Sequence, residues 1–133
     1  MIPKFRAYDS SSYKRMYKPD EVMVGNGDIW IIDEDSCDNE WIVNNDIHLM
    51  QSTGFEDSLG DVIFEGDIIF WTYWDGFEDS GSAKIIFDNG MFKLLDIYTE
   101  KEVWDNLFDC GENCDIYIKG NIYENPELLE VTK

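Results

Sequence analysis

The residues with the widest chemical range in this sequence are one histidine and three cysteines. Cys110 and Cys114 are separated by three residues, and a structural zinc site would need two further ligands. Only Cys37 and His48 could supply them, and nothing in the local sequence brings these two residues to the pair. The pair also lacks the redox spacing, in which two residues separate the cysteines. We therefore expect free or buried thiols, with no metal and no other cofactor.

The acidic stretch Asp33–Glu40 offers oxygen ligands of the kind that calcium prefers. A calcium loop of the EF-hand type requires glycine at its sixth position and glutamate at its twelfth. Counted from Asp33, those positions hold Asp38 and Asn44. The stretch is therefore predicted to be a solvated acidic loop.

Catalysis of the Ser–His–Asp type would depend on His48, the only histidine, and the sequence contains no strained nucleophile turn. Glu65 and Asp67 could form a pair of acid–base carboxylates. In a chain with 29 acidic residues, however, such pairs are expected by chance. A glycine-rich phosphate-binding loop is also missing from the sequence. We predict that the protein is not an enzyme and has no catalytic residues.

The chain has 133 residues, with 29 acidic and 10 basic side chains and a formal net charge of −19. This charge opposes direct contact with nucleic-acid phosphates or with an anionic membrane. No apolar stretch approaches the roughly 20 residues that a membrane-spanning helix needs. An odd number of cysteines favours a reducing compartment. The length and composition predict an acidic, soluble, cytoplasmic protein of one domain, or of one domain with a small appendage.

The charge is distributed unevenly along the chain. Half of the basic residues precede residue 19, where Asp9 is the only acid, so the first 18 residues carry +4 and the other 115 carry −23. Opposite charges of this kind attract each other within one chain or between chains. The alternative is that the basic residues are ordinary solvated residues of edge strands. We expect a homo-oligomer whose contact lies near Lys4, Arg6, Lys14 and Arg15.

Short, frequent strand signals separated by Gly, Asn and Asp favour a mostly β roll or small barrel. Gly25-Asn26-Gly27 and Asp88-Asn89-Gly90 supply the positive φ angles of tight hairpin turns. Gly54 is expected to end a strand, and residues 75–82 are expected to form a polar loop. The predicted strands are Lys4–Asp9, Tyr13–Tyr17, Val22–Val24, Asp28–Ile32, Glu40–Asn44, Ile47–Thr53, Val62–Phe64, Asp67–Trp74, Ala83–Phe87, Met91–Leu95 and Ile116–Tyr123.

One helix is predicted over Thr99–Phe108. Thr99 and Glu102 have the spacing of a capping box, and the apolar residues that follow share one helical face. Gly111 is expected to stop this helix, and Pro126 is expected to begin a final helical turn.

The core is predicted from apolar residues on the central strands. Trp71, Tyr73 and Trp74 crowd one strand, which cannot bury consecutive side chains on a single face. Some of these three rings are therefore expected to form an exposed aromatic contact, unless both sheet faces are covered. The predicted core residues are Phe64, Ile68, Phe70, Ile85, Phe87, Phe92, Leu94, Ile118 and Ile122.

Three blocks of the sequence have a recognisable order. The first is Lys4–Asp9 followed by Lys14–Tyr17, the second is Leu49–Ile69 with Glu65-Gly66-Asp67, and the third is Gly120–Leu129. Together they resemble the YopX family of phage and prophage proteins, with a tyrosine where the first block of the family usually has tryptophan. The acidic stretch lies between the blocks, and the resemblance says nothing about it.

The resemblance implies an SH3-like β-roll over residues 49–133, preceded by a small N-terminal β region over residues 1–48, the two forming one family unit. It also implies a phage or prophage origin and a bacterial cytoplasm, and it supplies no mechanism. We expect a small, non-enzymatic binding or assembly module. The alternative is an acidic decoy that imitates nucleic acid and binds a basic host or phage protein.

Overall fold

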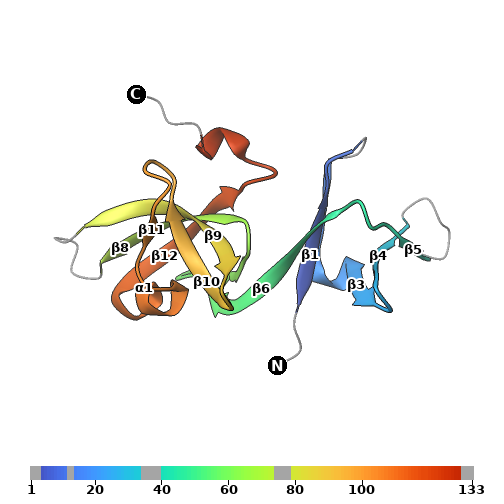
Figure 1. Ribbon diagram of the computed structural model, residues 1–133, viewed down its shortest axis with the longest axis horizontal. Coiled ribbons are helices and arrows are strands. Elements are labelled where there is room, and N and C mark those ends of the chain that lie inside the picture. The colour runs from blue at the N-terminus through green and yellow to red at the C-terminus, as the bar shows by residue number, and fades with distance from the viewer. Residues whose placement is uncertain (1–3, 12–13, 34–39, 74–78, 130–133) are drawn as a thin grey trace. The chain divides into compact units, whose positions relative to one another are not determined.

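A computed structural model describes residues 4–11, 14–33, 40–73 and 79–129. The chain divides into two compact units, Met1–Ser52 and Thr53–Lys133 (Figure 1). The division falls inside strand β6 (His48–Glu56), which begins in the first unit and ends in the second. The sequence predicted this boundary after residue 48.

The first unit contains two groups of antiparallel strands. β1 (Phe5–Asp9) pairs with β2 (Arg15–Tyr17) as a hairpin and with the first residues of β6. A short 3-10 helix, η1 (Pro19–Glu21), leads from β2 to a three-stranded sheet of order β3-β4-β5. The strands of this sheet are β3 (Val22–Gly25), β4 (Asp28–Ile32) and β5 (Trp41–Val43).

The turn between β3 and β4 follows its sequence signal. Asn26 has a φ of 53° and Gly27 has a φ of 80°, which are conformations that these two residue types adopt at low cost. The resulting hairpin packs one face against β1 and β2. The small core of this unit consists of Ala7, Tyr17, Val22, Ile31 and Ile47.

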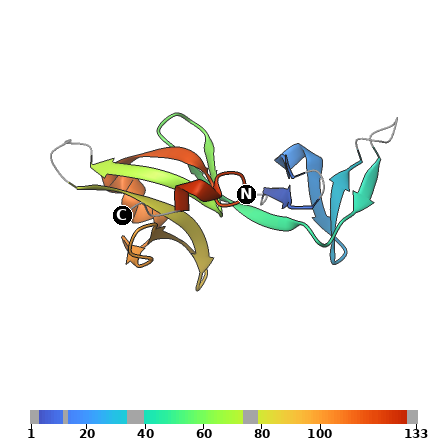
Figure 2. The ribbon, with the colours of Figure 1, turned by 90° about the horizontal axis from the view of Figure 1, so that it is seen from above.

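The second unit is built on a five-stranded antiparallel sheet of order β11-β10-β9-β8-β12, which curls into a half-barrel (Figures 1 and 2). β7 (Val62–Phe64) pairs with β6. The mostly β fold is confirmed. The strands of the large sheet are β8 (Asp67–Tyr73), β9 (Ser80–Asp88), β10 (Met91–Asp96), β11 (Glu102–Val103) and β12 (Cys114–Asn121).

Two strand limits differ from the sequence predictions. β6 continues through Gly54, which has a φ of 81°, instead of ending there. The strand is held across this glycine because Thr53 Oγ1 donates to the carbonyl of Ile63 at 2.7 Å and accepts from the amide of Phe55 at 3.1 Å. β9 begins at Ser80, inside the predicted polar loop, of which residues 75–78 lie outside the described residues.

The α-helix of the second unit lies later in the chain than predicted. α1 spans Leu107–Asn113, and residues within the predicted helix Thr99–Phe108 form β11 instead. The prediction was wrong because Asp96 Oδ1 accepts the amides of Tyr98 and Thr99 at 2.8 and 2.9 Å. These bonds fold the segment into a turn, after which β11 pairs with β10.

The residues that cap and end this helix also differ from the predicted ones. Asn106, not Thr99, caps the helix by accepting the amide of Asp109 at 2.9 Å. Gly111 lies inside α1 and does not stop it. The predicted final turn is confirmed as a 3-10 helix, η2 (Pro126–Leu129).

The predicted core residues near the middle of the large sheet are buried, whereas one at the turn between β9 and β10 is exposed. Phe64, Ile68, Ile85 and Leu94 are buried. Phe87 is 47% exposed, because it lies two residues beyond Ile85 on β9, at the hairpin turn where the sheet extends past the core. The other four predicted core residues, Phe70, Phe92, Ile118 and Ile122, are partly buried. Within the described residues, no helix has the length and apolar character needed to cross a membrane.

Candidate functional site

The only histidine lies at a polar hairpin end. His48 is exposed on β6, and its Nε2 is 3.1 Å from Ser10 Oγ. Asp9 accepts hydrogen bonds from the hydroxyl and amide of Ser11, which lower the pKa of Asp9, and the charge of His48 acts in the same direction. These contacts fit a structural role for His48, and the absence of enzymatic activity stays a prediction.

The paired cysteines are buried in the second unit. Cys110 lies on α1 and Cys114 begins β12, and both are free thiols. Burial is the largest effect that raises the pKa of each, so both remain protonated and weakly nucleophilic near neutral pH. Among the residues that the structure describes, no three His, Cys, Asp or Glu side chains are grouped to hold a metal ion. Cys37 lies outside them, as does most of the acidic stretch.

Glu65 and Asp67, the carboxylate pair of the second sequence block, flank a tight turn. Asp67 is buried, and its Oδ2 accepts the amide of Phe64 at 2.8 Å. Gly66 between them has a φ of 88°, which glycine adopts without strain. The block therefore specifies the reversal into β8.

Two further polar residues of the blocks also satisfy backbone groups. Asp57 Oδ1 accepts the amides of Leu59 and Asp61 at 3.0 and 2.9 Å, while its Oδ2 accepts that of Ile118 at 3.2 Å. Asn121 Oδ1 accepts the amides of the two residues that start the final corner, at 3.0 and 2.8 Å. Both side chains are buried, and they fix a turn and a chain corner.

The basic residues of the first unit have different surroundings. Arg15 Nη2 is 2.5 Å from Glu21 Oε2, and the guanidinium lies 4.3 Å from the ring centre of Tyr17. Lys4 and Lys14 are exposed, and Arg6 is partly buried. Arg15 is thus engaged within its own unit, and a role for these residues in self-association stays a prediction.

Trp71 does not form the exposed aromatic contact that was predicted. It is 6% exposed, and its ring packs edge-on against Trp104 and Tyr73 at centroid distances of 5.5 and 6.1 Å. Trp71 is buried because Trp104, from the segment after β11, covers this part of β8, and a contact through the other two rings stays a prediction. Tyr73 is partly buried, and Trp74 lies outside the described residues.

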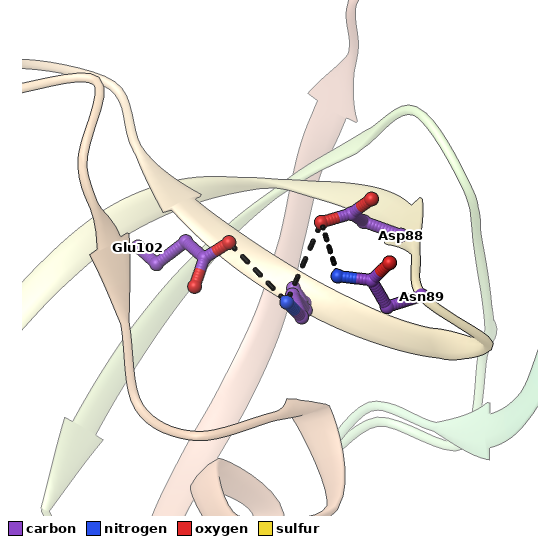
Figure 3. A network of polar contacts seen from close by, with 4 residues as sticks. Asp88, Asn89 and Glu102 are labelled. Atoms are coloured by element: carbon purple, nitrogen blue, oxygen red, sulfur yellow. Dashed lines mark hydrogen bonds and ion pairs between the residues drawn. The ribbon is translucent and has the colours of Figure 1, made fainter.

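A polar cluster on the large sheet is shown in Figure 3. Lys93 Nζ is 3.4 Å from both Asp88 Oδ2 and Glu102 Oε1, which lie on β9 and β11. Burial lowers the pKa of Lys93, but the hydrogen bonds and charges of Glu102 and Asp88 outweigh it and raise that pKa above its ordinary value. The cluster connects three neighbouring strands and keeps Lys93 protonated.

The three-stranded sheet of the first unit has an apolar surface that sequence reasoning missed. In the cross-strand register, Met23 and Val43 both lie opposite Trp30, and Trp41 lies opposite Ile32. Paired residues share a sheet face, so these five apolar side chains form one face, called here the open face. Three of its members are exposed and the two on the central strand are partly buried. The run of apolar residues in β4 was the available signal.

A second surface feature, called here the α1 hollow, lies between α1 and strands β6, β7 and β12. Its volume is about 190 Å³. No feature of the sequence predicted this hollow, because its walls come from segments far apart in the chain. The lining residues are Phe55, Glu56, Ile63, Leu107, Phe108, Gly111, Glu112 and Ile116.

The fold and these surfaces define an acidic, antiparallel β protein of two units with exposed apolar surface on each. The family model described as YopX protein matches residues 4–130, and the chain belongs to the YopX family. No curated protein matches the chain.

Two solved structures resemble the chain over nearly its whole length. Protein EF1440 from Enterococcus faecalis is 28% identical, with a TM-score of 0.62, and the match covers 98% of this chain and 99% of that one. YopX from Bacillus subtilis is 19% identical, with a TM-score of 0.63 and coverage of 96% and 98%. At that identity, the likeness to the second structure shows the fold.

Proposed function

We propose that this YopX-family protein is a small, non-enzymatic binding or assembly module that self-associates through its open face. It acts in the cytoplasm of a bacterium and is encoded by a phage or prophage. The observation that supports this function is the open face itself, in which five apolar side chains share one side of a three-stranded sheet. Contiguous apolar surface of this kind on a small protein is typical of an interaction site.

The chemistry of the open face favours a second copy as its occupant. Met23, Trp41 and Val43 are exposed there, and burying a large apolar side chain fully contributes about 1.5–3 kcal/mol. Two copies of a chain with net charge −19 repel each other, so apolar burial must exceed this repulsion. The basic segment with Lys4 and Lys14 reduces the repulsion where it approaches acidic groups of the neighbour.

Light scattering on the purified chain tests this function. We expect an oligomer that dissociates to a monomer in the double variant Trp41→Ser/Val43→Ser. The control Leu59→Ser/Met91→Ser removes two exposed apolar side chains from the other unit and leaves the oligomer intact. A monomeric wild-type chain, or equal dissociation of both variants, would contradict the proposal.

Salt separates the two contributions to assembly. At about 1 M salt the screening length falls to ~3 Å, so docking dominated by the basic segment weakens. Association through the open face persists, because apolar burial is not screened. If salt alone produces monomers, the contact is electrostatic and the open face is not its main part.

A second function, an acidic decoy for a basic nucleic-acid-binding protein, is favoured by the charge of the second unit. Residues 53–133 contain 19 acidic and 5 basic residues, a formal charge of −14. A decoy would displace labelled DNA from a purified basic DNA-binding protein of the host, and salt would abolish the displacement. Failure to displace DNA at low salt would exclude this function.

A further inference from the structure

We infer that the α1 hollow is a peptide-binding site, which receives one large apolar side chain from a partner segment flanked by lysine or arginine. The inference rests on the proposed binding function and names a partner chemistry for the second unit, whereas the open face belongs to the first. It depends on the shape of the hollow, on its exposed rings and on the charge at its rim.

The hollow has an apolar floor of fixed side chains. Ile63, Leu107 and Ile116 are buried, and they belong to the core of the second unit. The volume of the hollow is about 190 Å³. For comparison, an enclosed apolar cavity of about 150 Å³ in a protein can hold one benzene molecule. This volume is sufficient for one leucine, methionine or phenylalanine side chain.

Two phenyl rings line the hollow in an exposed position. Phe55 from β6 is 39% exposed and Phe108 from α1 is 54% exposed, and their ring centroids are 6.1 Å apart. The two rings contact each other, so a partner side chain packed over the pair would remove part of both rings from water. This burial supplies a driving force that does not depend on charge.

The charges at the hollow select a basic partner. Glu56 and Glu112 line it and are exposed, and no lysine or arginine is among its lining residues. The unit around it carries a formal charge of −14, so an anionic ligand such as a fatty acid or a nucleotide is repelled. Lysine or arginine beside the inserted side chain can pair with the two glutamates and can lie against the phenyl faces.

A second copy of the chain is a poorer occupant of the hollow. A second copy could offer the hollow only its basic segment, and the rest of that copy, residues 19–133 with a formal charge of −23, would be repelled by the acidic second unit. A basic segment of a different protein gains attraction where a second copy is repelled. The structure therefore favours a peptide of another protein.

Gly111 provides a direct way to fill the hollow without disturbing the helix. It lies within α1, and a Cβ added there would meet only Ile116 Cδ1, at 4.0 Å. Leucine in place of this glycine would place its side chain beside the lining of the hollow and occupy the space that the inferred side chain needs. A matched control is Gly25→Leu in the first unit, where an added Cβ meets no atom within 4 Å.

The test uses the full chain and a fluorescent, end-blocked peptide of sequence lysine-arginine-phenylalanine-arginine-lysine, with binding followed by anisotropy. We expect saturable binding that weakens about tenfold or more, ~1.4 kcal/mol, when serine replaces the phenylalanine of the peptide. Gly111→Leu should weaken binding to the same extent, and Gly25→Leu should leave it unchanged. Circular dichroism checks that each variant is folded.

The charge of the rim is tested by a second pair of variants. Glu56→Gln/Glu112→Gln should weaken peptide binding several-fold, whereas Glu100→Gln/Glu127→Gln removes the same charge outside the hollow and should have little effect. Equal binding of the phenylalanine and serine peptides, or equal loss in both glutamine variants, would mean that only bulk charge attracts the peptide, and the inference would be wrong.

Light scattering on Gly111→Leu distinguishes the remaining outcome. If this variant loses self-association, the hollow holds a second copy and the inferred partner is incorrect. If it loses peptide binding and keeps its oligomeric state, the peptide site is supported independently of assembly through the open face. Loss of self-association in Trp41→Ser/Val43→Ser alone concerns the open face and leaves the hollow unaffected.

Discussion

The same substitution, glycine to alanine, should have opposite effects at two positions of the second unit. In Gly111→Ala, the new methyl group meets only Ile116 Cδ1 at 4.0 Å, and the helical backbone suits alanine. Alanine restricts the unfolded chain more than glycine does, so the free energy of unfolding should rise by about 0.5–1 kcal/mol. In Gly81→Ala, the new Cβ would lie 2.8 Å from Trp71 Cζ2, which is closer than such atoms approach.

The clash at Gly81 cannot be relieved by a free rotation of the indole. Trp71 is held by its edge-on contacts with Trp104 and Tyr73, so the ring or strand β9 must shift. Overpacking of this kind costs typically about 1–3 kcal/mol, which exceeds the entropic gain from alanine. The melting temperature of Gly81→Ala should therefore fall, by about 4–8 °C for each kcal/mol in a unit of this size.

Near-ultraviolet circular dichroism during thermal melting measures both effects, because the signal of the packed tryptophans reports on the second unit. We expect a higher melting temperature for Gly111→Ala and a lower one, with an altered native spectrum, for Gly81→Ala. An unchanged spectrum together with unchanged or raised stability in Gly81→Ala would refute the packing described for Trp71.

Three further predictions concern stability and reactivity. Truncating buried Phe64 to alanine should lower the free energy of unfolding in urea by about 3–5 kcal/mol, whereas Phe87→Ala, at a half-exposed position, should lower it by less than about half of that. Equal losses would contradict the difference in burial between the two rings. Asp57→Ala should cost about 2–4 kcal/mol, because it leaves three backbone amides without their acceptor, and a loss below about 1 kcal/mol would show that the turn does not depend on them. Burial raises the pKa of Cys110 and Cys114, so the stability that these protonated thiols contribute should be full below about pH 8.5 and decrease as the pH rises further. Urea unfolding of Cys110→Ala/Cys114→Ala tests this: if the variant loses as much free energy of unfolding at alkaline pH as the wild type does, the assignment is wrong.

Local chemistry in the sequence determined much of the strand pattern. Asn26-Gly27 and Asn89-Gly90 adopt the positive φ angles that their residue types favour, and hairpins form at both places. Val62–Phe64 is a strand with the predicted limits. These features depend on residues close together in the chain, because the backbone φ preferences of asparagine and glycine are local and need no contact with the rest of the fold.

Competition between local signals was decided by tertiary contacts. The capping box at Thr99 is a valid helix signal, but the amide of Thr99 donates to Asp96 and the residues that follow pair with β10 as β11. The helix therefore starts only after Asn106, which caps it. Strand pairing that satisfies backbone groups in the sheet outweighs a helix propensity of a few tenths of a kcal/mol per residue.

Exposure was decided by which distant segment covers each residue. Trp71 and Phe87 both lie on strands of the large sheet. Trp104 covers Trp71, whereas nothing among the described residues covers Phe87 to the same degree. The α1 hollow likewise needs Phe55 and Phe108 to meet from β6 and α1. The sequence by itself determined the turns, most strands and the acidic charge, because these depend on neighbouring residues or on composition. Burial, the helix position and the surface hollows were decided only by the tertiary structure, because they depend on contacts between segments far apart in the chain.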